Sequence, residues 1–206
     1  MPEQPEFHVV AGRTERPSAP LLLLHGSGMD EAALVPLADL AAPERPYIAL
    51  RGAIAWEDGF AFFRRNPDRS LDQADLARRT DELCQFIETA LQLGTLKQAP
   101  ILVGFSNGAI MAASILLRRP RLAAAAILMR PLSPAQDVPF PPLTALPILI
   151  TSGAYDQRRE PGDADILENQ LANADADVSA HVLATGHDLN QDDIGIIRDW
   201  LIRKGL

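Results

Sequence analysis

One serine of this chain stands between two glycines, in the segment 104–108 that reads Gly-Phe-Ser-Asn-Gly. An apolar run at 101–103 precedes the segment, and a run typical of a helix follows at 109–113. A serine in such a sharp turn has a strained backbone, and its neighbours two positions away must lack side chains to avoid collision. The turn also aims the hydroxyl toward unpaired N–H groups at a helix N-terminus. The pattern matches a G-x-S-x-G nucleophile turn and predicts Ser106 as a nucleophile, although a glycine-rich turn alone is only moderately specific.

A serine nucleophile needs a base to take its proton, and the base needs an acidic group to orient it. Two histidines follow Ser106 in the chain, His181 and His187. His181 lies inside a predicted strand, where we expect a packed or surface residue. His187 lies just past the end of that strand. Loops at the carboxyl ends of parallel strands carry the sites of α/β proteins, so the sequence favours His187 as the base.

The orienting acid should follow the preceding predicted strand, and Asp156 has that place. Asp163 and Asp165 are better explained as the acidic first turn of the next helix. Asp188 is adjacent to His187, but a side chain one position away rarely points back to its neighbour's ring. The sequence therefore favours Asp156.

An oxyanion site needs backbone N–H groups from two loops. The run 21–28 reads Leu-Leu-Leu-Leu-His-Gly-Ser-Gly, an apolar strand followed by a glycine-bearing turn. We expect the N–H groups of Ser27 and Asn107 to bind the oxyanion. A dinucleotide-binding turn is the alternative, but Glu31 stands where its third glycine is expected. His25 precedes the nucleophile in the chain, and we expect it to stabilise its loop.

The elements that must position these groups are short apolar runs alternating with longer amphipathic ones, a pattern typical of strands joined by crossover helices. Several runs are apolar throughout, as in strands covered on both faces. We predict strands at 7–11, 20–24, 47–50, 100–104, 124–129, 147–152 and 178–184. We predict helices at 71–93, after Ser106, at 163–174 and from the N-cap Asn190 onward. The expected fold is α/β, with a mostly parallel sheet of about seven strands and helices on both faces. The stretches 51–70 and 131–147 are expected to be irregular, and neither is long enough for a separate lid domain.

Composition limits the partners. Hydrophobic residues make up 47% of the 206 residues, which suits one compact domain spanning 1–206. A formal net charge of −8 speaks against nucleic acids and anionic membranes, since both need a basic face. The start of the chain lacks the pattern of a signal peptide, and we expect a cytoplasmic protein. The single cysteine, Cys84, lies in a helical pattern and is expected to be a core residue.

Two arginines and two aromatic residues are candidate substrate contacts. Arg51 and Arg130 each follow a predicted strand directly, so both should lie at the edge that carries the site. Phe62 and Phe63 lie in the stretch 51–70, which we expect to cross that edge. Together they would suit a small ester with a carboxylate, which arginine binds bidentately. Alternatively, the arginines pair with acidic side chains and only hold loops in place. The acidic candidates are Glu31, Glu57 and Asp58.

The motifs taken together resemble a known family. The turn at 25–28, the serine turn at 104–108, Asp156 after Ser152-Gly153, and Gly186-His187 are similar to the carboxylesterase/phospholipase branch of the α/β-hydrolase superfamily. Further short segments resemble a subgroup of small bacterial esterases, and the resemblance spans about 21–201. It implies the α/β-hydrolase fold, with Ser106, His187 and Asp156 as the catalytic triad. Two departures are Asn107, where glutamine is common, and a turn at 157–161 that is more polar than usual.

The expected activity follows from the triad and the resemblance. We expect cleavage of carboxylic esters of small acyl or aromatic substrates through an acyl-enzyme, with no metal or organic cofactor, by a monomer or homodimer. A thioesterase or lysophospholipase of the same fold is an alternative that only a panel of substrates separates. A catalytically silent domain that binds a ligand is another, and the complete Ser, Asp and His set argues against it.

Overall fold

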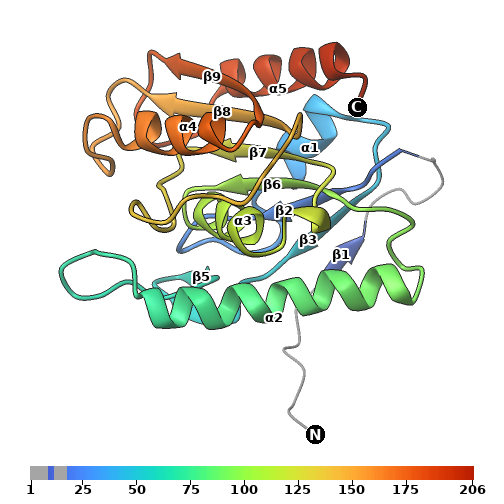
Figure 1. Cartoon of the computed structure of the whole chain (residues 1–206), viewed down its shortest axis with the longest axis horizontal. Coiled ribbons are helices and arrows are strands. Elements are labelled where there is room, and N and C mark those ends of the chain that lie inside the picture. The colour runs from blue at the N-terminus through green and yellow to red at the C-terminus, as the bar shows by residue number, and fades with distance from the viewer. Residues whose placement is uncertain (1–8, 12–17) are drawn as a thin grey trace, which may run out of the picture.

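The computed structural model describes residues 9–11 and 18–206 and is built on one central sheet (Figure 1). Its strands are β1 (Val9–Ala11), β2 (Leu21–Leu24), β3 (Tyr47–Leu50), β6 (Ile101–Phe105), β7 (Ala125–Met129), β8 (Pro147–Gly153) and β9 (Asp177–Leu183). The seven strands are ordered β1-β3-β2-β6-β7-β8-β9. Only β1 runs antiparallel to its neighbour, and all other pairs are parallel. The prediction of a mostly parallel sheet of about seven strands is confirmed.

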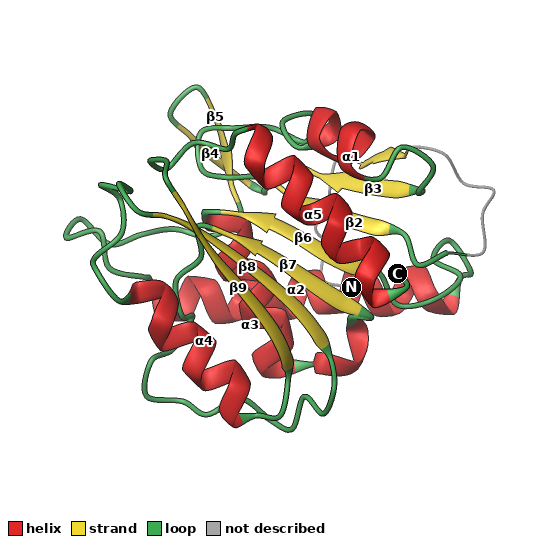
Figure 2. Ribbon diagram, turned by 90° about the horizontal axis from the view of Figure 1, so that it is seen from above, coloured by secondary structure: helices red, strands yellow, loops and turns green. Residues whose placement is uncertain are grey.

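Helices cover both faces of this sheet (Figure 2). They are α1 (Val35–Ala41), α2 (Gln73–Gln92), α3 (Asn107–Arg118), α4 (Asp163–Asn173) and α5 (Gln191–Lys204). One face carries α2, α3 and α4, and the other carries α1 and α5. The N-cap prediction for α5 is confirmed, because the Asn190 side chain and the Asp193 carboxylate form a reciprocal capping box.

The leucine run of β2 explains why the strands are apolar throughout. Leu22 and Leu24 join the core under α2 and α3, whereas Leu21 and Leu23 join the core under α1 and α5. Successive strand residues point to opposite faces, so a strand covered on both faces must be apolar at every position. Within the described residues, no helix has the length and apolar character needed to cross a membrane.

The structure differs from the sequence-based expectations in two places, and a third prediction lies partly outside the described residues. The stretch 51–70 is not wholly irregular, since it contains a hairpin of β4 (Ile54–Trp56) and β5 (Gly59–Ala61). The helix α1 was not predicted, because seven residues are too few to establish a helical period. For the predicted strand 7–11, the structure shows β1 over Val9–Ala11, and Phe7 and His8 lie outside the described residues.

The serine turn depends on two close backbone contacts. A Cβ at Gly104 would lie 2.4 Å from the carbonyl oxygen of Gly108, and a Cβ at Gly108 would lie 2.0 Å from that of Leu24. Both distances are far below van der Waals contact. The first glycine therefore lets the chain turn back on itself, and the second lets the start of α3 rest against the end of β2.

Gly108 and Gly195 form a matched pair for a stability test, because both lie inside helices. At Gly195 an added Cβ meets nothing within 4 Å, so Gly195→Ala should raise the free energy of unfolding by about 0.5–1 kcal/mol. Gly108→Ala should lower it by about 3 kcal/mol or more, because the methyl group collides with backbone. Urea unfolding of both variants measures the difference. Equal effects at the two positions would contradict the close contact at Gly108.

Candidate active site

Ser106 lies between the end of β6 and the start of α3, in a strained conformation. Its φ of 52° and ψ of −108° are rare for a residue with a side chain. Its N–H donates to the Met129 carbonyl at 2.9 Å, and its carbonyl accepts from Ala109 and Ile110 at 3.1 Å each. These bonds to β7 and α3 hold the strained backbone. Such strain persists only where the surrounding structure enforces it, and it is common at active sites.

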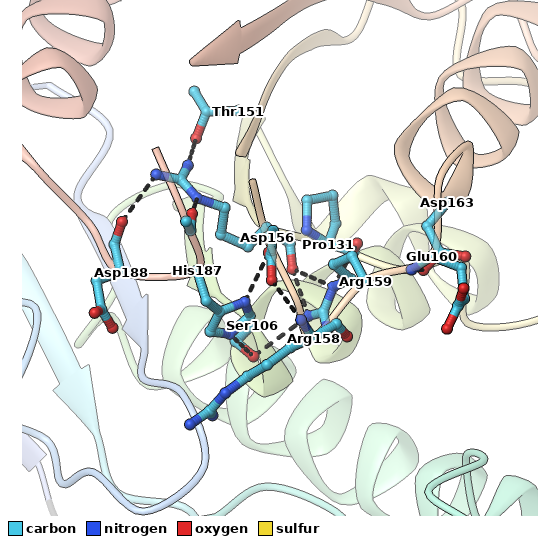
Figure 3. A network of polar contacts seen from close by, with 12 residues as sticks. Ser106, Pro131, Thr151, Asp156, Arg158, Arg159, Glu160, Asp163, His187 and Asp188 are labelled. Atoms are coloured by element: carbon cyan, nitrogen blue, oxygen red, sulfur yellow. Dashed lines mark hydrogen bonds and ion pairs between the residues drawn. The ribbon is translucent and has the colours of Figure 1, made fainter. Parts of the chain in front are cut away.

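The structure brings Ser106, His187 and Asp156 together in one chain of hydrogen bonds (Figure 3). The Ser106 Oγ lies 2.9 Å from the His187 Nε2, and the His187 Nδ1 lies 2.7 Å from an Asp156 carboxylate oxygen. Asp156 follows β8 and His187 follows β9, two parallel neighbours. Their carboxyl ends therefore share the edge at which β6 ends.

The tautomer of His187 follows from its partners. A carboxylate can only accept, so Nδ1 carries the proton and Nε2 is left to accept the hydroxyl proton of Ser106. The other Asp156 oxygen accepts from the Arg158 N–H at 2.8 Å, which fixes the carboxylate. The His187 ring is 10% exposed and the Asp156 side chain 3%. Burial lowers the pKa of His187, and the hydrogen bond to Asp156 partly opposes that shift. The lowered pKa favours the neutral imidazole, which can accept a proton at Nε2.

The expected oxyanion donors lie in two segments that meet beside the serine turn. Asn107 is the first residue of α3, so its N–H has no acceptor within the helix. Its buried side chain accepts from the Phe62 N–H at 2.8 Å and donates to the Phe63 carbonyl at 3.2 Å. Ser27 lies in the turn after β2, and the next N–H, of Gly28, donates to the Phe60 carbonyl at 3.0 Å.

His25 stabilises its loop, as the sequence predicted. The buried ring donates from Nδ1 to the Gly26 carbonyl at 2.7 Å, and its Nε2 accepts from the Gly52 N–H at 2.9 Å. Burial lowers the pKa of His25, consistent with a neutral ring in this role. His25 therefore ties the Ser27 turn to the segment after β3.

The expectation that Phe62 and Phe63 contact the substrate is wrong. Phe62 and Phe63 are only 2% and 1% exposed and belong to the core between the sheet and the helices α2, α3 and α4. Short strands and turns interrupt any alternation of apolar and polar residues in this segment. The sequence pattern therefore did not indicate that both rings point inward. Their backbone groups bind the Asn107 side chain, and their rings present almost no surface to a ligand.

Arg51 and Arg130 both have structural partners, as the alternative interpretation proposed. Arg51 makes two hydrogen bonds to Glu31, at 2.5 and 2.6 Å, and its guanidinium stacks on Phe60 at 4.5 Å. Arg130 is completely buried and forms a bidentate pair with Asp193, each bond 2.8 Å long. A side chain without exposed surface offers nothing to a substrate. The expectation that Arg130 contacts the ligand is therefore corrected.

The buried Arg130 instead supports the loop that carries His187. Its Nε lies 3.4 Å from the Gly186 carbonyl, and its Nη2 donates to the Asp188 carbonyl at 3.1 Å. These carbonyls flank His187 on both sides. Arg130 also donates to the Thr151 hydroxyl at 2.9 Å, which connects the loop to β8.

One residue at the site was missed by the sequence interpretation. The Nη2 of Arg159 lies 3.3 Å from the Ser106 Oγ (Figure 3). The signal was the pair Arg158-Arg159 in the unusually polar turn at 157–161. Two adjacent arginines in a loop give no indication of which side chain turns inward, so only the structure distinguishes them.

Cys84 and the acidic groups offer no second chemical centre. Burial raises the pKa of the Cys84 thiol to about 11, so it remains protonated inside α2. Across residues 9–11 and 18–206, no three or more His, Cys, Asp or Glu side chains are grouped to hold a metal ion.

The chain is similar in sequence and in fold to carboxylesterases. A model of the phospholipase/carboxylesterase family matches residues 5–203. A carboxylesterase crystal structure from Bacillus cereus is 30% identical, with a TM-score of 0.90 over 96% of this chain and 94% of the other. One from Mesorhizobium loti is 35% identical, with a TM-score of 0.84 over 89% and 88%. The Bacillus subtilis (strain 168) protein named "Putative hydrolase MhqD" is 32% identical over 181 residues, 87% of this chain and 90% of its own length.

The ionisation of His187 can be tested by NMR of its ring nitrogens. Because burial disfavours the cation, the pKa should lie below the ordinary 6.5. Asp156→Asn removes the group that raises this pKa, so the variant should titrate at still lower pH. A titration above 6.5, or an upward shift in Asp156→Asn, would contradict the assignment of the two opposing effects.

The pair Arg130–Asp193 predicts a large stability effect. Arg130→Gln leaves a buried carboxylate without its cation, which should lower the free energy of unfolding by about 3–5 kcal/mol. The control is Arg118→Gln, because Arg118 pairs with Asp81 at 2.6 Å with both side chains 40% or more exposed. Its loss should change stability by less than about 1 kcal/mol. If denaturant unfolding gives similar values for the two variants, the buried pair is not a structural support.

Proposed function

The chain belongs to the phospholipase/carboxylesterase family and is a carboxylesterase-type hydrolase; from this premise we propose that it cleaves carboxylic esters through an acyl-enzyme on Ser106. One observation carries the proposal. The hydroxyl of Ser106, whose backbone is strained, lies 2.9 Å from Nε2 of the neutral His187. Nδ1 of the same ring lies 2.7 Å from the nearly buried Asp156 carboxylate, so the three groups form one hydrogen-bonded chain.

The first half of the proposed reaction forms the acyl-enzyme. His187 Nε2 takes the proton of Ser106 as Oγ attacks the ester carbonyl carbon. Negative charge then develops on the carbonyl oxygen. In this proposal the backbone N–H groups of Ser27 and Asn107 stabilise it, aided by the N-terminal dipole of α3. The imidazolium gives its proton to the leaving alcohol.

The second half releases the acid. Water takes the place of the alcohol and gives a proton to His187 as it attacks the acyl carbon. Collapse of the second tetrahedral intermediate returns the proton to Ser106 Oγ. Asp156 keeps the ring in the required tautomer throughout and stabilises its transient positive charge. No step calls for a metal or an organic cofactor.

The substrate that we propose is a small-molecule ester with a small acyl or aromatic group. The same atoms would also cleave a thioester or a lysophospholipid, and no contact among the described residues favours either. Ligand binding alone does not require an imidazole 2.9 Å from the hydroxyl of a serine with a strained backbone, so this geometry disfavours a catalytically silent domain.

Ser106→Ala should abolish hydrolysis of short p-nitrophenyl esters, with a loss of roughly 10⁴-fold or more in turnover. Folding should be preserved, because one hydroxyl contributes little to stability. A fluorophosphonate probe should label the wild-type chain at Ser106, as peptide mapping would show. Retention of more than a tenth of the activity, or labelling elsewhere, would sink the assignment.

Asp156→Asn should lower turnover by roughly 10⁴-fold, because the amide permits the wrong imidazole tautomer. Asp165→Asn is the matched control, since Asp165 lies exposed in the first turn of α4 and stays away from the triad. Steady-state kinetics on the same ester compares them. The proposal fails if Asp165→Asn is the more damaging change.

A further inference from the structure

Arg159 brings a positive charge to the nucleophile. It lies in the loop between β8 and α4, with its side chain turned back toward Ser106 (Figure 3). The Nη2 to Oγ distance is 3.3 Å, long for a hydrogen bond between these atoms. The proposed acyl-enzyme cycle does not use this side chain, so its position needs another explanation.

Backbone carbonyls hold the guanidinium in one orientation. Its Nε and Nη2 both donate to the Arg130 carbonyl, at 3.0 and 2.5 Å, and Nε also reaches the Pro131 carbonyl at 3.1 Å. Nη1 donates to the Arg158 carbonyl at 3.1 Å. One side edge of the planar group is thereby anchored. The end edge, formed by Nη1 and Nη2, is the one that touches Ser106.

This end edge retains donor capacity. A guanidinium carries five N–H donors, and the anchoring carbonyls together with Ser106 occupy four of them, leaving one N–H of Nη1 without an acceptor among the described residues. Nη1 and Nη2 together form the end edge of the group, and Nη2 makes the weak contact to Ser106. Two parallel donors at one edge match the geometry of a carboxylate.

The charge of Arg159 is not neutralised by an ion pair. Arg51, Arg118 and Arg130 each make a bidentate contact to a carboxylate, whereas Arg159 has no such partner in the part of the chain that the structure describes. The pKa of Arg159 is lowered to about 10, first by burial and then by the nearby Arg65, while the carboxylates of Asp156 and Asp163 partly oppose the shift. The group is still a cation at neutral pH. A half-buried cation that feels carboxylates only at a distance, and that forms no direct ion pair among the described residues, is well suited to bind an anion.

We propose that Arg159 binds a carboxylate carried by the ester, so that anionic esters are the preferred substrates of this site. The proposal rests on Ser106 being the nucleophile. It replaces the expectation that Arg51 and Arg130 bind such a group, since both are already paired. An ester carbon in position for attack lies about 3 Å from the attacking oxygen. The carboxylate must therefore be only a few bonds from the reacting carbonyl, as in half-esters of short dicarboxylic acids.

The matched substrates are monoethyl succinate and ethyl succinamate, which differ only by a carboxylate in place of an amide on the acyl side. Acetoxyacetate carries its carboxylate on the alcohol side and identifies which half of the ester Arg159 contacts. The readout is kcat/KM for the anionic ester divided by kcat/KM for the neutral one. A ratio is needed because general stabilisation of the Ser106 alkoxide by Arg159 would change both substrates equally.

The wild-type chain should prefer at least one anionic ester by roughly tenfold or more, and Arg159→Gln should lower that ratio by roughly tenfold to hundredfold. Arg159→Lys should restore part of it, because it keeps the charge but not the planar edge. Arg158→Gln is the matched control: it removes the same charge one position away, from a side chain that is exposed, and should leave the ratio unchanged. Thermal unfolding checks that each variant is folded.

Two outcomes of the kinetics would overturn the proposal. One is a wild-type chain that prefers ethyl succinamate over every anionic ester. The other is an equal loss in Arg158→Gln and Arg159→Gln, which would show that only the general field matters.

A binding measurement separates this proposal from the esterase mechanism. In the Ser106→Ala background, calorimetry should detect succinate, and Arg159→Gln should abolish that binding. If no ester is hydrolysed by the wild-type chain but succinate binds in an Arg159-dependent way, the anion site stands and the mechanism fails. If esters are hydrolysed and succinate does not bind, the anion site fails alone.

Discussion

The left-handed backbone of Ser106 is the constraint on which the site depends. That conformation persists because β7 holds the N–H, α3 holds the carbonyl, and α3 itself rests against the end of β2. The contact between α3 and β2 exists only because position 108 has no side chain. The absence of a side chain at position 108 thus sets the distance between two parts of the site. These are Ser106, the proposed nucleophile just before α3, and the turn after β2 that carries Ser27.

A second dependence runs through Arg130, whose two ends support different parts of the triad. The guanidinium contacts the carbonyls on either side of His187 and is itself held by Asp193 of α5. The backbone carbonyl accepts two donors from Arg159, in the loop that also carries Asp156. One buried residue with a φ of 52° therefore contacts both the loop of His187, the proposed base, and the loop of Asp156, the proposed acid. It is a positioning residue rather than a substrate contact.

The sequence was most informative where chemistry requires a fixed backbone. The glycines at 104 and 108 predicted the turn, and the places of Asp156 and His187 after predicted strands identified residues that the structure brings within hydrogen-bond distance. The inner strands β2, β6 and β7 followed from apolar runs that must face two cores. In each of these cases a local pattern is tied to one geometry by sterics or by burial.

The sequence did not predict the directions of the arginine side chains. Three of them follow strands or lie in loops near the site, yet Arg130 turns into the core, Arg51 lies along Glu31, and Arg159 reaches Ser106. A side chain with four rotatable bonds has a reach set by tertiary partners, so neighbours in sequence do not determine its direction. The aromatic pair at 62 and 63 follows the same logic, because a short hairpin turned both rings inward.

Asp193 illustrates a broader consequence for how this chain can change. Its carboxylate accepts from the N–H of Asn190 at the start of α5, from the Arg130 guanidinium and from the Thr151 hydroxyl. Glutamate is one methylene too long and asparagine lacks the charge, so neither meets all three demands. Among folded and active variants from random mutagenesis, this position should therefore remain Asp although it lies outside the triad. Positions on the outward face of the same helix should accept many substitutions. A library for altered activity gains nothing by sampling position 193 and is better concentrated on the loop at 154–162.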